Sequence, residues 1–586
     1  MKNIDDISDY NYKNEKTWIF SHLTKYKLLF GLFVLSSILV AFFSVKLSDC
    51  TGRAFDIILG KDSNLGNFKS NIYLMGAVTF LVLVFKLTNY LFIELMASRM
   101  ERDSRKEIYY VLLKKNQTFL GEKKTGEIMA NANSDVQLLN GMVNPGISNI
   151  INTMINQIFS LFFIARINYK LLIVPVLYEI VFLIYLPHFS KKIYPVIKDS
   201  INSFHNISAK LNEVLSGIMV VQSCAQEAEE RKMFWKQLEN DCELNVRKTK
   251  TQAMFLPLLF FGLTVALSFV HSIYLFNHNF INIGDVVYYI SLITLMNAHS
   301  STYVDCVVHM ENGLSAARSI IKFISFGTGE EENGGDIISG IKGAVEFENV
   351  SLSYNDNLIL DNISFSVNPG QVVAIVGQTG SGKSTLCKLI NRIYTPTSGK
   401  IKIDGIDISN WEINNLRSQI AVVEQEVELF SKSIKENICF GKKNIVNDRL
   451  INEVADIVCA DKFISNTESG YDTQLSDQGV TLSGGERQRL ALARAVIVDS
   501  NILVLDDSTS AIDSSTANDI YESLRDKIFK GKTVFIITNN LSEIQKADKI
   551  IMLKKGKMLS YGSHDELFEK CSDYRSLFTE TKYARR

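Results

Sequence analysis

Residues 371–385 read QVVAIVGQTGSGKST, and this stretch decides the fold of the C-terminal part of the chain. The apolar run has the composition of a buried strand, and the pattern G-x-x-x-x-G-K-[ST] starts at its last residue. Glycines in such a loop let backbone N–H groups converge on phosphate oxygens at the N-terminus of the following helix. Lys383 is expected to reach the β- and γ-phosphates, and Ser384 is expected to hold Mg²⁺. The predicted nucleotide-binding residues of this loop are Gly377, Thr379, Gly380, Ser381, Gly382, Lys383, Ser384 and Thr385.

A second apolar run, NILVLDD at residues 501–507, ends in two carboxylates. P-loop enzymes keep an aspartate at the end of such a strand, where it holds Mg²⁺ through water, and Asp506 has that position. Between the two runs lies LSGGERQRLALARA, in which a serine and paired glycines open a predicted helix. The start of that helix is expected to be a second anion-binding N-terminus.

Together these motifs resemble the ATP-binding cassette of ABC transporters, where they occur in the same order. LSGGE resembles the family signature, which is usually LSGGQ. The resemblance implies that two cassettes face each other head to tail, with each ATP between the P-loop of one and the signature of the other. It also implies that Tyr354 stacks on adenine, and that Gln425 in VVEQEVELF joins Ser384 and Asp506 at the Mg²⁺ site. Asp477 stands where exporters have a glutamate that contacts the membrane domain. The residues that the resemblance adds to the nucleotide site are Tyr354, Leu482, Ser483, Gly484, Gly485, Glu486 and Asp513.

Two positions depart from the family pattern. The usual general base is a glutamate directly after Asp506, and here it is Asp507, whose side chain is one methylene shorter. The usual switch histidine lies in an AHRLS pattern after a strand, and here VFIITNNLS places Asn539 at that position. An amide can hydrogen-bond a phosphate but carries no imidazolium charge. We therefore predict a catalytically degenerate ATP site, with Asp507, Asn539 and Gln425 at the catalytic positions.

The N-terminal part of the chain contains six apolar runs, at residues 28–45, 72–96, 147–167, 171–186, 255–276 and 285–304. A helix needs about 20 mostly apolar residues to cross a bilayer. The alternative for the more polar runs is a buried helix of a soluble protein, but six such runs are hard to bury without lipid. The predicted fold is an α-helical polytopic membrane domain of six long transmembrane helices, plus an α/β P-loop domain of the ATP-binding cassette type.

The connectors predict the orientation of these spans. Residues 97–145 and 190–253 are rich in Lys and Arg, whereas residues 277–284 have neither. Because positive charge stays on the cytoplasmic side, both long connectors and both termini are expected there. We predict a cytoplasmic segment with an interfacial helix at residues 1–27, the membrane domain at 28–325, a linker at 326–342 and the nucleotide-binding domain at 343–586.

Several polar residues lie inside the predicted spans. Asn149 and Asn156 share one helix face with other polar residues, and His271 lies on a similar face of the fifth span. Such faces either line a wet path or pack helix against helix. Glu179 is at the middle of its span, where a carboxylate is costly and has a partner or a function. It is expected either to pair, for example with Lys86, or to contact substrate.

The sequences TGEIMANANSDV (residues 125–136) and EVLSGIMVVQSCAQEAEERKMF (residues 213–234) resemble the intracellular loops of exporters with six spans per subunit. The resemblance therefore implies ATP-driven export across a cell membrane. The degenerate site favours a heterodimer, in which the LSGGE of this chain completes the ATP site of a second half-transporter. A homodimeric exporter with slow hydrolysis, and an ATP-regulated channel or regulatory membrane protein, remain alternatives.

The composition sets further limits. The formal net charge of −1 gives no basic excess, so we expect no nucleic-acid partner. The eight cysteines form no C-x-x-C pair, which favours reduced, structural thiols. Abundant Ile, Asn and Lys are typical of a bacterial protein. The expected cofactors are ATP and Mg²⁺, and the expected partners are a second subunit, the lipid bilayer and an unidentified substrate.

Overall fold

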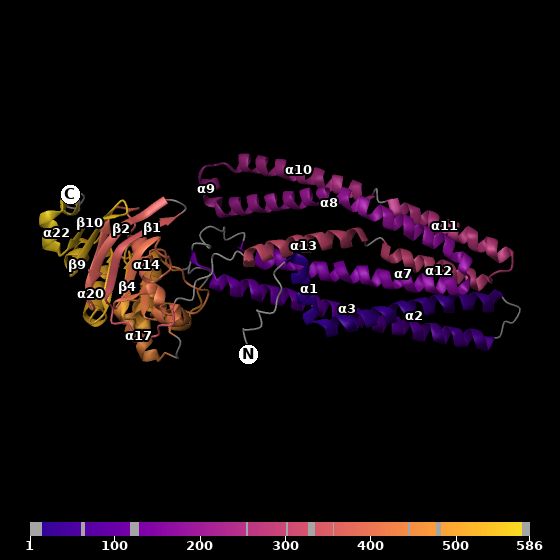
Figure 1. Ribbon diagram of the computed structural model, residues 1–586, viewed down its shortest axis with the longest axis horizontal. Helices are drawn as coiled ribbons and strands as arrows, with labels where there is room; N and C mark the ends of the chain where they lie inside the picture. The colour runs from indigo at the N-terminus through magenta and orange to yellow at the C-terminus, as the bar shows by residue number, and fades with distance from the viewer. Residues whose placement is uncertain are drawn as a thin grey trace. The chain divides into compact units, whose positions relative to one another are not determined.

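The structure is a computed structural model that describes residues 14–59, 65–117, 128–129, 131–253, 256–300, 303–325, 335–354, 357–442, 446–475 and 482–576. The chain divides into two compact units. The first contains residues 1–114 and 123–328, and the second contains residues 115–122 and 329–586. The first unit is helical and the second contains all the strands of the described residues, as Figure 1 shows.

Long helices make up the first unit. Their bounds are α1 (Glu15–Lys25), α2 (Lys27–Leu59), α3 (Leu65–Lys114), η2 (Asn131–Asp135), α6 (Val136–Gly141), η3 (Met142–Ile147), α7 (Ser148–Ile167), η4 (Tyr169–Leu172), α8 (Ile173–Ser216), α9 (Ile218–Ser223), α10 (Glu227–Ala253), α11 (Leu256–Asn277), α12 (Ile283–Ser300) and α13 (Tyr303–Ser325).

Four stretches of this unit are long and apolar enough to cross a membrane. They are 27–59, 66–114, 131–167 and 169–189, and two shorter apolar stretches lie at 261–277 and 283–296, within the described residues. The helical membrane domain and the following α/β domain that the sequence predicts are therefore confirmed, while the number of six spans stays a prediction.

A polar cluster joins three of the membrane helices. Asn89 of α3 donates from Nδ2 to the carbonyl oxygen of Phe33, at 3.1 Å, and to the hydroxyls of Ser36 and Ser37 of α2, at 3.1 and 2.7 Å. Its Oδ1 accepts from Asn152 of α7, at 3.5 Å. Because lipid offers no hydrogen bonds, these contacts hold the three helices together where the hydrophobic effect cannot.

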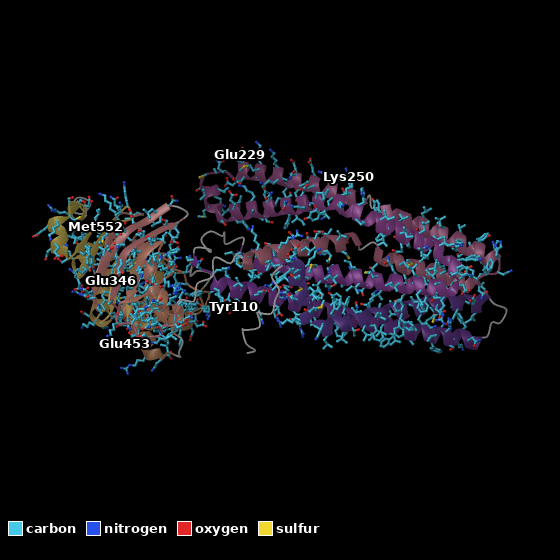
Figure 2. The ribbon with its side chains drawn as sticks, viewed as in Figure 1. Tyr110, Glu229, Lys250, Glu346, Glu453 and Met552 are labelled. Carbon is cyan, nitrogen blue, oxygen red and sulfur yellow. The ribbon has the colours of Figure 1, made fainter. Side chains whose placement is uncertain are left out.

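Two helices continue far beyond the apolar segments and form a paired arm. α8 and α10 run side by side in Figure 1 and are joined by the short helix α9, while Glu229 and Lys250 mark the two ends of α10 in Figure 2. Lys210 forms an ion pair with Glu230 at 3.2 Å, and Ser200 donates to Asn245 at 2.9 Å. The long connector at residues 190–253 is therefore helical along its length apart from two short breaks around α9.

Two sheets form the framework of the second unit. The first has four strands in the order β2-β1-β4-β5 and is antiparallel. The second has six in the order β10-β9-β3-β8-β7-β6, parallel except for β10. The strands are β1 (Val345–Tyr354), β2 (Asn357–Val367), β3 (Val372–Gly377), β4 (Ser398–Ile403), β5 (Ile406–Asp407), β6 (Ile420–Val423), β7 (Ile502–Asp506), β8 (Thr533–Ile537), β9 (Lys549–Lys554) and β10 (Lys557–Gly562).

Strands β3, β7 and β8 are almost entirely buried, as expected for a parallel sheet covered on both faces. The helices of this unit are α14 (Lys383–Ile390), η5 (Ile408–Asn410), α15 (Ile413–Ser418), α16 (Ile434–Ile438), η6 (Cys439–Gly441), α17 (Asp448–Ile457), α18 (Asp461–Ser465), η7 (Gly470–Asp472), α19 (Gly484–Val498), α20 (Ser514–Lys527), α21 (Leu541–Gln545) and α22 (His564–Lys570). Among them, α14 packs against β3, β7 and β8, and α19 packs against β6. Parallel strands end at one edge of a sheet, and ligands of such folds bind at that edge.

The described end of the predicted linker belongs to the second unit. Backbone N–H groups of Gly335 and Ile337 donate to the carbonyl oxygens of Ser409 and Asn410, at 2.8 and 3.2 Å. Ile341 is buried, and its N–H donates to Gln419 at 2.7 Å. Residues 335–341 are thus packed along the domain that follows them.

Candidate functional site

The loop between β3 and α14 requires glycine at two positions. A Cβ on Gly377 would lie 2.2 Å from the carbonyl oxygen of Leu553 and 2.8 Å from Oγ of Ser381. Gly382 caps α14 with a φ of 97°, in the left-handed region that favours glycine. The buried Ser381 hydroxyl has no hydrogen-bond partner among the residues that the structure describes, so the loop still has a polar group to offer a ligand.

Lys383 is the first residue of α14, and its side chain folds back over this loop. Nζ donates to the carbonyl oxygens of Gly377 and Gln378, at 2.9 and 3.0 Å. Burial lowers the pKa of Lys383, whereas the carboxylates of Asp506 and Asp507 oppose that shift. The ammonium group is thus held at the loop where the phosphates are expected.

Two carboxylates follow one another at the end of β7. Burial raises the pKa of Asp506, the hydrogen bond with Ser384 lowers it, and the charge of Asp507 raises it. Burial also raises the pKa of Asp507, and Lys383 lowers it. The N–H of Asp507 donates to the carbonyl of Ile537 at 3.0 Å, and its φ of 47° lies in the left-handed region.

A cavity of about 240 Å³ opens where β3, β6, β7 and β8 end. It brings together most of the predicted P-loop residues, both acids, and the two residues at the glutamine and switch positions. Asn539 is exposed at its rim. We call this cavity the phosphate cavity, and it is lined by Thr379, Gly380, Gly382, Lys383, Ser384, Thr385, Gln425, Asp506, Asp507, Ile537, Thr538 and Asn539.

The predicted adenine-stacking residue lies outside this lining. Tyr354 ends β1, and its ring contacts that of Tyr394 edge to face, with centroids 4.9 Å apart. Burial and a hydrogen bond with Tyr394 raise the pKa of Tyr354. Sequence reasoning did not include Tyr394, although the aromatic residue in RIYTPT soon after α14 could have indicated it.

The signature residues also lie outside the cavity of their own chain. Ser483 caps α19, and its hydroxyl and its N–H both donate to Glu486, each at 2.8 Å. Beside them, a Cβ on Gly485 would lie 3.0 Å from the carbonyl oxygen of Ala511. The predicted residues Leu482 and Gly484 belong to the same segment.

Gln488, which sequence reasoning missed, ties the signature helix to the loop after β7. Its Oε1 accepts from the N–H of Ala511 at 2.9 Å, and its Nε2 donates to Ser510 at 3.0 Å. Asp513 ends that loop by capping α20, and hydrogen bonds from Ser515 and Thr516 lower the pKa of Asp513 to about 2. Asp477 lies outside the described residues.

The predicted pathway residues are distributed over three helices of the first unit. Asn149 and Asn156 lie on α7, Glu179 on α8 and His271 on α11. Asn156 donates to the carbonyl oxygen of Asn152 at 2.8 Å. Among the described residues, no hydrogen bond is formed by the buried Oε1 of Glu179 or the buried Nδ1 of His271, and no ion pair joins Glu179 to Lys86.

The first unit contains a larger polar cavity, of about 910 Å³. It lies between the α8–α10 arm and residues of η2, α6 and α13, and none of the four predicted pathway residues lines it. Acidic and basic side chains face it together. They are Asp135, Lys198, Asp241, His309, Glu311 and Arg318.

Comparisons with known proteins match both parts of the chain. The family described as ABC transporter transmembrane region matches residues 3–300, and the family described as ABC transporter matches residues 360–510. The ATP-dependent lipid A-core flippase of Pseudomonas aeruginosa is 31% identical over 477 residues, which cover 81% of this chain and 79% of that protein. YgaD of Bacillus subtilis is 29% identical over 493 residues, which cover 83% of this chain and 85% of that protein. Its name describes a proposed multidrug export ATP-binding/permease protein.

The fold also matches a solved structure, that of a bacterial Atm1-family ABC exporter with ATP bound. The TM-score is 0.81 at 23% identity, over 96% of this chain and 98% of that chain. With one transmembrane region fused to one ATPase domain, this chain belongs to the ABC transporter family and is a half-transporter of the exporter type, in which ATP hydrolysis is coupled to transport.

Proposed function

We propose that this chain is one half of a heterodimeric exporter of the bacterial cell membrane, and that its own ATP site turns over slowly. The observation that carries this proposal is the pair Asp507 and Asn539, which both line the phosphate cavity at the positions of general base and switch residue. The binding loop beside them keeps Lys383, Ser384 and its glycines. The site therefore keeps the residues that bind ATP, whereas the residues that would activate water, at positions 507 and 539, differ from the family pattern.

The shorter side chain of Asp507 explains the expected slow turnover. Its carboxylate ends on the order of 1 Å short of the place that a glutamate would reach, and a misplacement of that size costs roughly a hundredfold in rate. Asn539 can donate one amide hydrogen bond but adds no positive charge as charge develops on the phosphate. The two changes act on the same step.

The signature supports a role at a partner's site. Gly484 and Gly485 begin a 15-residue helix that Ser483 caps, and none of the three lines the cavity of its own chain. The N–H groups at such a helix start favour an anion. A phosphate supplied by a second cassette is the anion that this arrangement fits, so the intact LSGGE segment serves the partner.

Mg²⁺ fits the donor set at this site. Ser384, Gln425 and Asp506 line the cavity together, which gives the hard oxygen donors that this ion prefers. When bound there, Mg²⁺ neutralises charge on the phosphate oxygens. The residues of this chain hold the nucleotide and orient the water.

The transporter works as a dimer in the lipid bilayer. We place both termini of this chain in the cytoplasm because its Lys- and Arg-rich connectors belong there.

The names of the relatives, a lipid A-core flippase and a proposed multidrug exporter, favour an organic, amphipathic cargo. The cavity between the α8–α10 arm and α13, with charges of both signs, is our candidate for the cargo path.

A homodimer with slow hydrolysis is the second candidate, because Asp507 still carries a carboxylate at the base position. Purifying the tagged chain from its native membrane separates the two. The heterodimer predicts that a second half-transporter with a glutamate and a histidine at these positions co-purifies in equal amount. Recovery of this chain paired only with itself would contradict it.

A further inference from the structure

Directly behind the switch position lies the buried carboxylate of Glu543, which has no role in the chemistry described so far. Three residues, 538–540, connect the end of β8 to the start of α21, and Glu543 is the third residue of that helix. Its side chain is 3% exposed. A carboxylate so deeply buried is costly unless hydrogen bonds compensate it.

Glu543 accepts a hydrogen bond from Asn540, one of the two residues that flank Asn539, and Asn540 is bonded to the other, Thr538. Nδ2 of Asn540 donates to Oε1 of Glu543 at 3.3 Å. The N–H of Asn540 in turn donates to Oγ1 of Thr538 at 3.0 Å. Burial raises the pKa of Glu543, whereas the bonds with Thr538 and Asn540 lower it.

These contacts form a closed set around residue 539. Oδ1 of Asn540 also accepts from the N–H of Ser542, at 3.1 Å, which fixes the start of α21. On the other side, the carbonyl of Ile537 accepts from the N–H of Asp507 at 3.0 Å. The backbone before and after Asn539 is therefore held, and both Thr538 and Asn539 line the phosphate cavity.

We propose that Glu543 is a positioning residue, which acts through Thr538 and Asn540 to hold the Asn539 amide at the γ-phosphate end of the cavity. This inference rests on the proposed function, in which Asn539 takes the place of the switch histidine. An apolar side chain would fill the same buried space. The carboxylate is needed because it accepts from the side chain of Asn540, whose backbone N–H in turn donates to Thr538 on the other side of Asn539.

A double-mutant cycle tests the proposal in the full-length complex in lipid nanodiscs. The probe is Mg-MANT-ATP, and the P-loop of the partner is disabled so that only the ATP site of this chain binds the probe. Asn539→Ala removes one net hydrogen bond and should weaken binding about two- to tenfold. Glu543→Leu and Thr538→Val should each weaken binding by a similar factor. In the Asn539→Ala background, neither should weaken it by more than about 1.5-fold, because residues that act through one another are not additive.

Two controls complete the cycle. Glu543→Gln keeps an acceptor of the same shape and should bind within about twofold of the unmodified chain. Glu522→Gln removes a neighbouring carboxylate whose ion pair with Lys546 is partly exposed, and it should leave binding unchanged.

The outcomes separate the two proposals. If Asn539→Ala alone leaves affinity unchanged, the switch role of Asn539 in the proposed function is wrong. If Asn539→Ala weakens binding while Thr538→Val and Glu543→Leu have no effect, or have their full effect in both backgrounds, then the positioning role of Glu543 is wrong. Thr538→Val keeps the test decisive should Glu543→Leu fail to fold.

Discussion

Lys383 holds its ammonium group on the carbonyl oxygens of Gly377 and Gln378, at the point where β3 and β7 end. Lys383→Ala removes the only cation that lines the cavity among the described residues. The variant should therefore lose nearly all labelling of this chain by a photoreactive ATP analogue. The matched control is Lys388→Ala, because Lys388 lies on the same helix but does not line the cavity. Undiminished labelling of Lys383→Ala would contradict the P-loop assignment.

Asp506 gives the site a dependence on pH. Its pKa is raised by burial and by the charge of Asp507, so it takes up a proton at a higher pH than an ordinary aspartate with a pKa of 3.8. Mg²⁺ requires the ionised form. The Mg²⁺-dependent part of ATP binding should therefore be lost as the pH falls through that raised pKa, at a higher pH than an ordinary aspartate would give.

Asp507→Asn provides the check on this pH dependence. Because it removes a neighbouring negative charge, it should lower the pKa of Asp506 and move the loss of Mg²⁺-dependent binding to lower pH. Titrations of MANT-ATP binding with and without Mg²⁺ measure the midpoint. A midpoint that stays in place or moves upward would show that the two carboxylates are not coupled as described.

Among the elements, α2, α3 and α7 are joined inside the membrane by Asn89. Asn89→Leu keeps the size of the side chain but removes its bonds to Phe33, Ser36 and Ser37. Interhelical hydrogen bonds in membranes contribute about 0.6 kcal/mol on average and up to about 1.7 kcal/mol. The free energy of unfolding should fall by an amount in this range, while Mg-ATP affinity should not change.

Thermal unfolding in a mild detergent measures the loss, and Tyr90→Leu is the control because the neighbouring side chain is exposed. Equal destabilisation by both variants would mean that the polar cluster contributes nothing specific.

The sequence predicted these elements unevenly. Apolar composition located the lipid-facing parts of α2 and α8, and α8 then continues as a helix to Ser216 through a polar arm. The strand and loop around Gly377 were predictable because phosphate binding imposes a local pattern. Gln488 was not, because it meets Ser510 and Ala511 only after α19 has packed against the loop that follows β7. Glu543 was not, because its partner Asn540 is local but its burial depends on the packing of the whole domain.

At the scale of the whole molecule, the account divides catalytic work between two unlike sites. Asp507→Glu combined with Asn539→His should restore a base of normal reach and a switch imidazole to this chain. Turnover should rise in a complex whose partner glutamate is disabled but whose partner signature is intact. A glutamate must adopt the left-handed φ of 47° at this position, which costs on the order of 1 kcal/mol and limits the gain.

ATPase activity at saturating Mg-ATP gives the readout, and Asp507→Glu alone and Asn539→His alone are the matched controls. The double variant should exceed both. Turnover no higher than that of the unrestored complex would show that these two side chains are not what limits the site.

ATP hydrolysis measured after each of two single substitutions in the same complex shows which of its two ATP sites turns over. Ser483→Ala changes the signature that we propose serves the partner, whereas Asp507→Asn changes the proposed base of this chain's own site. The account predicts that ATP hydrolysis by the complex falls strongly with Ser483→Ala and changes little with Asp507→Asn. Hydrolysis that stops with Asp507→Asn and persists with Ser483→Ala would contradict it.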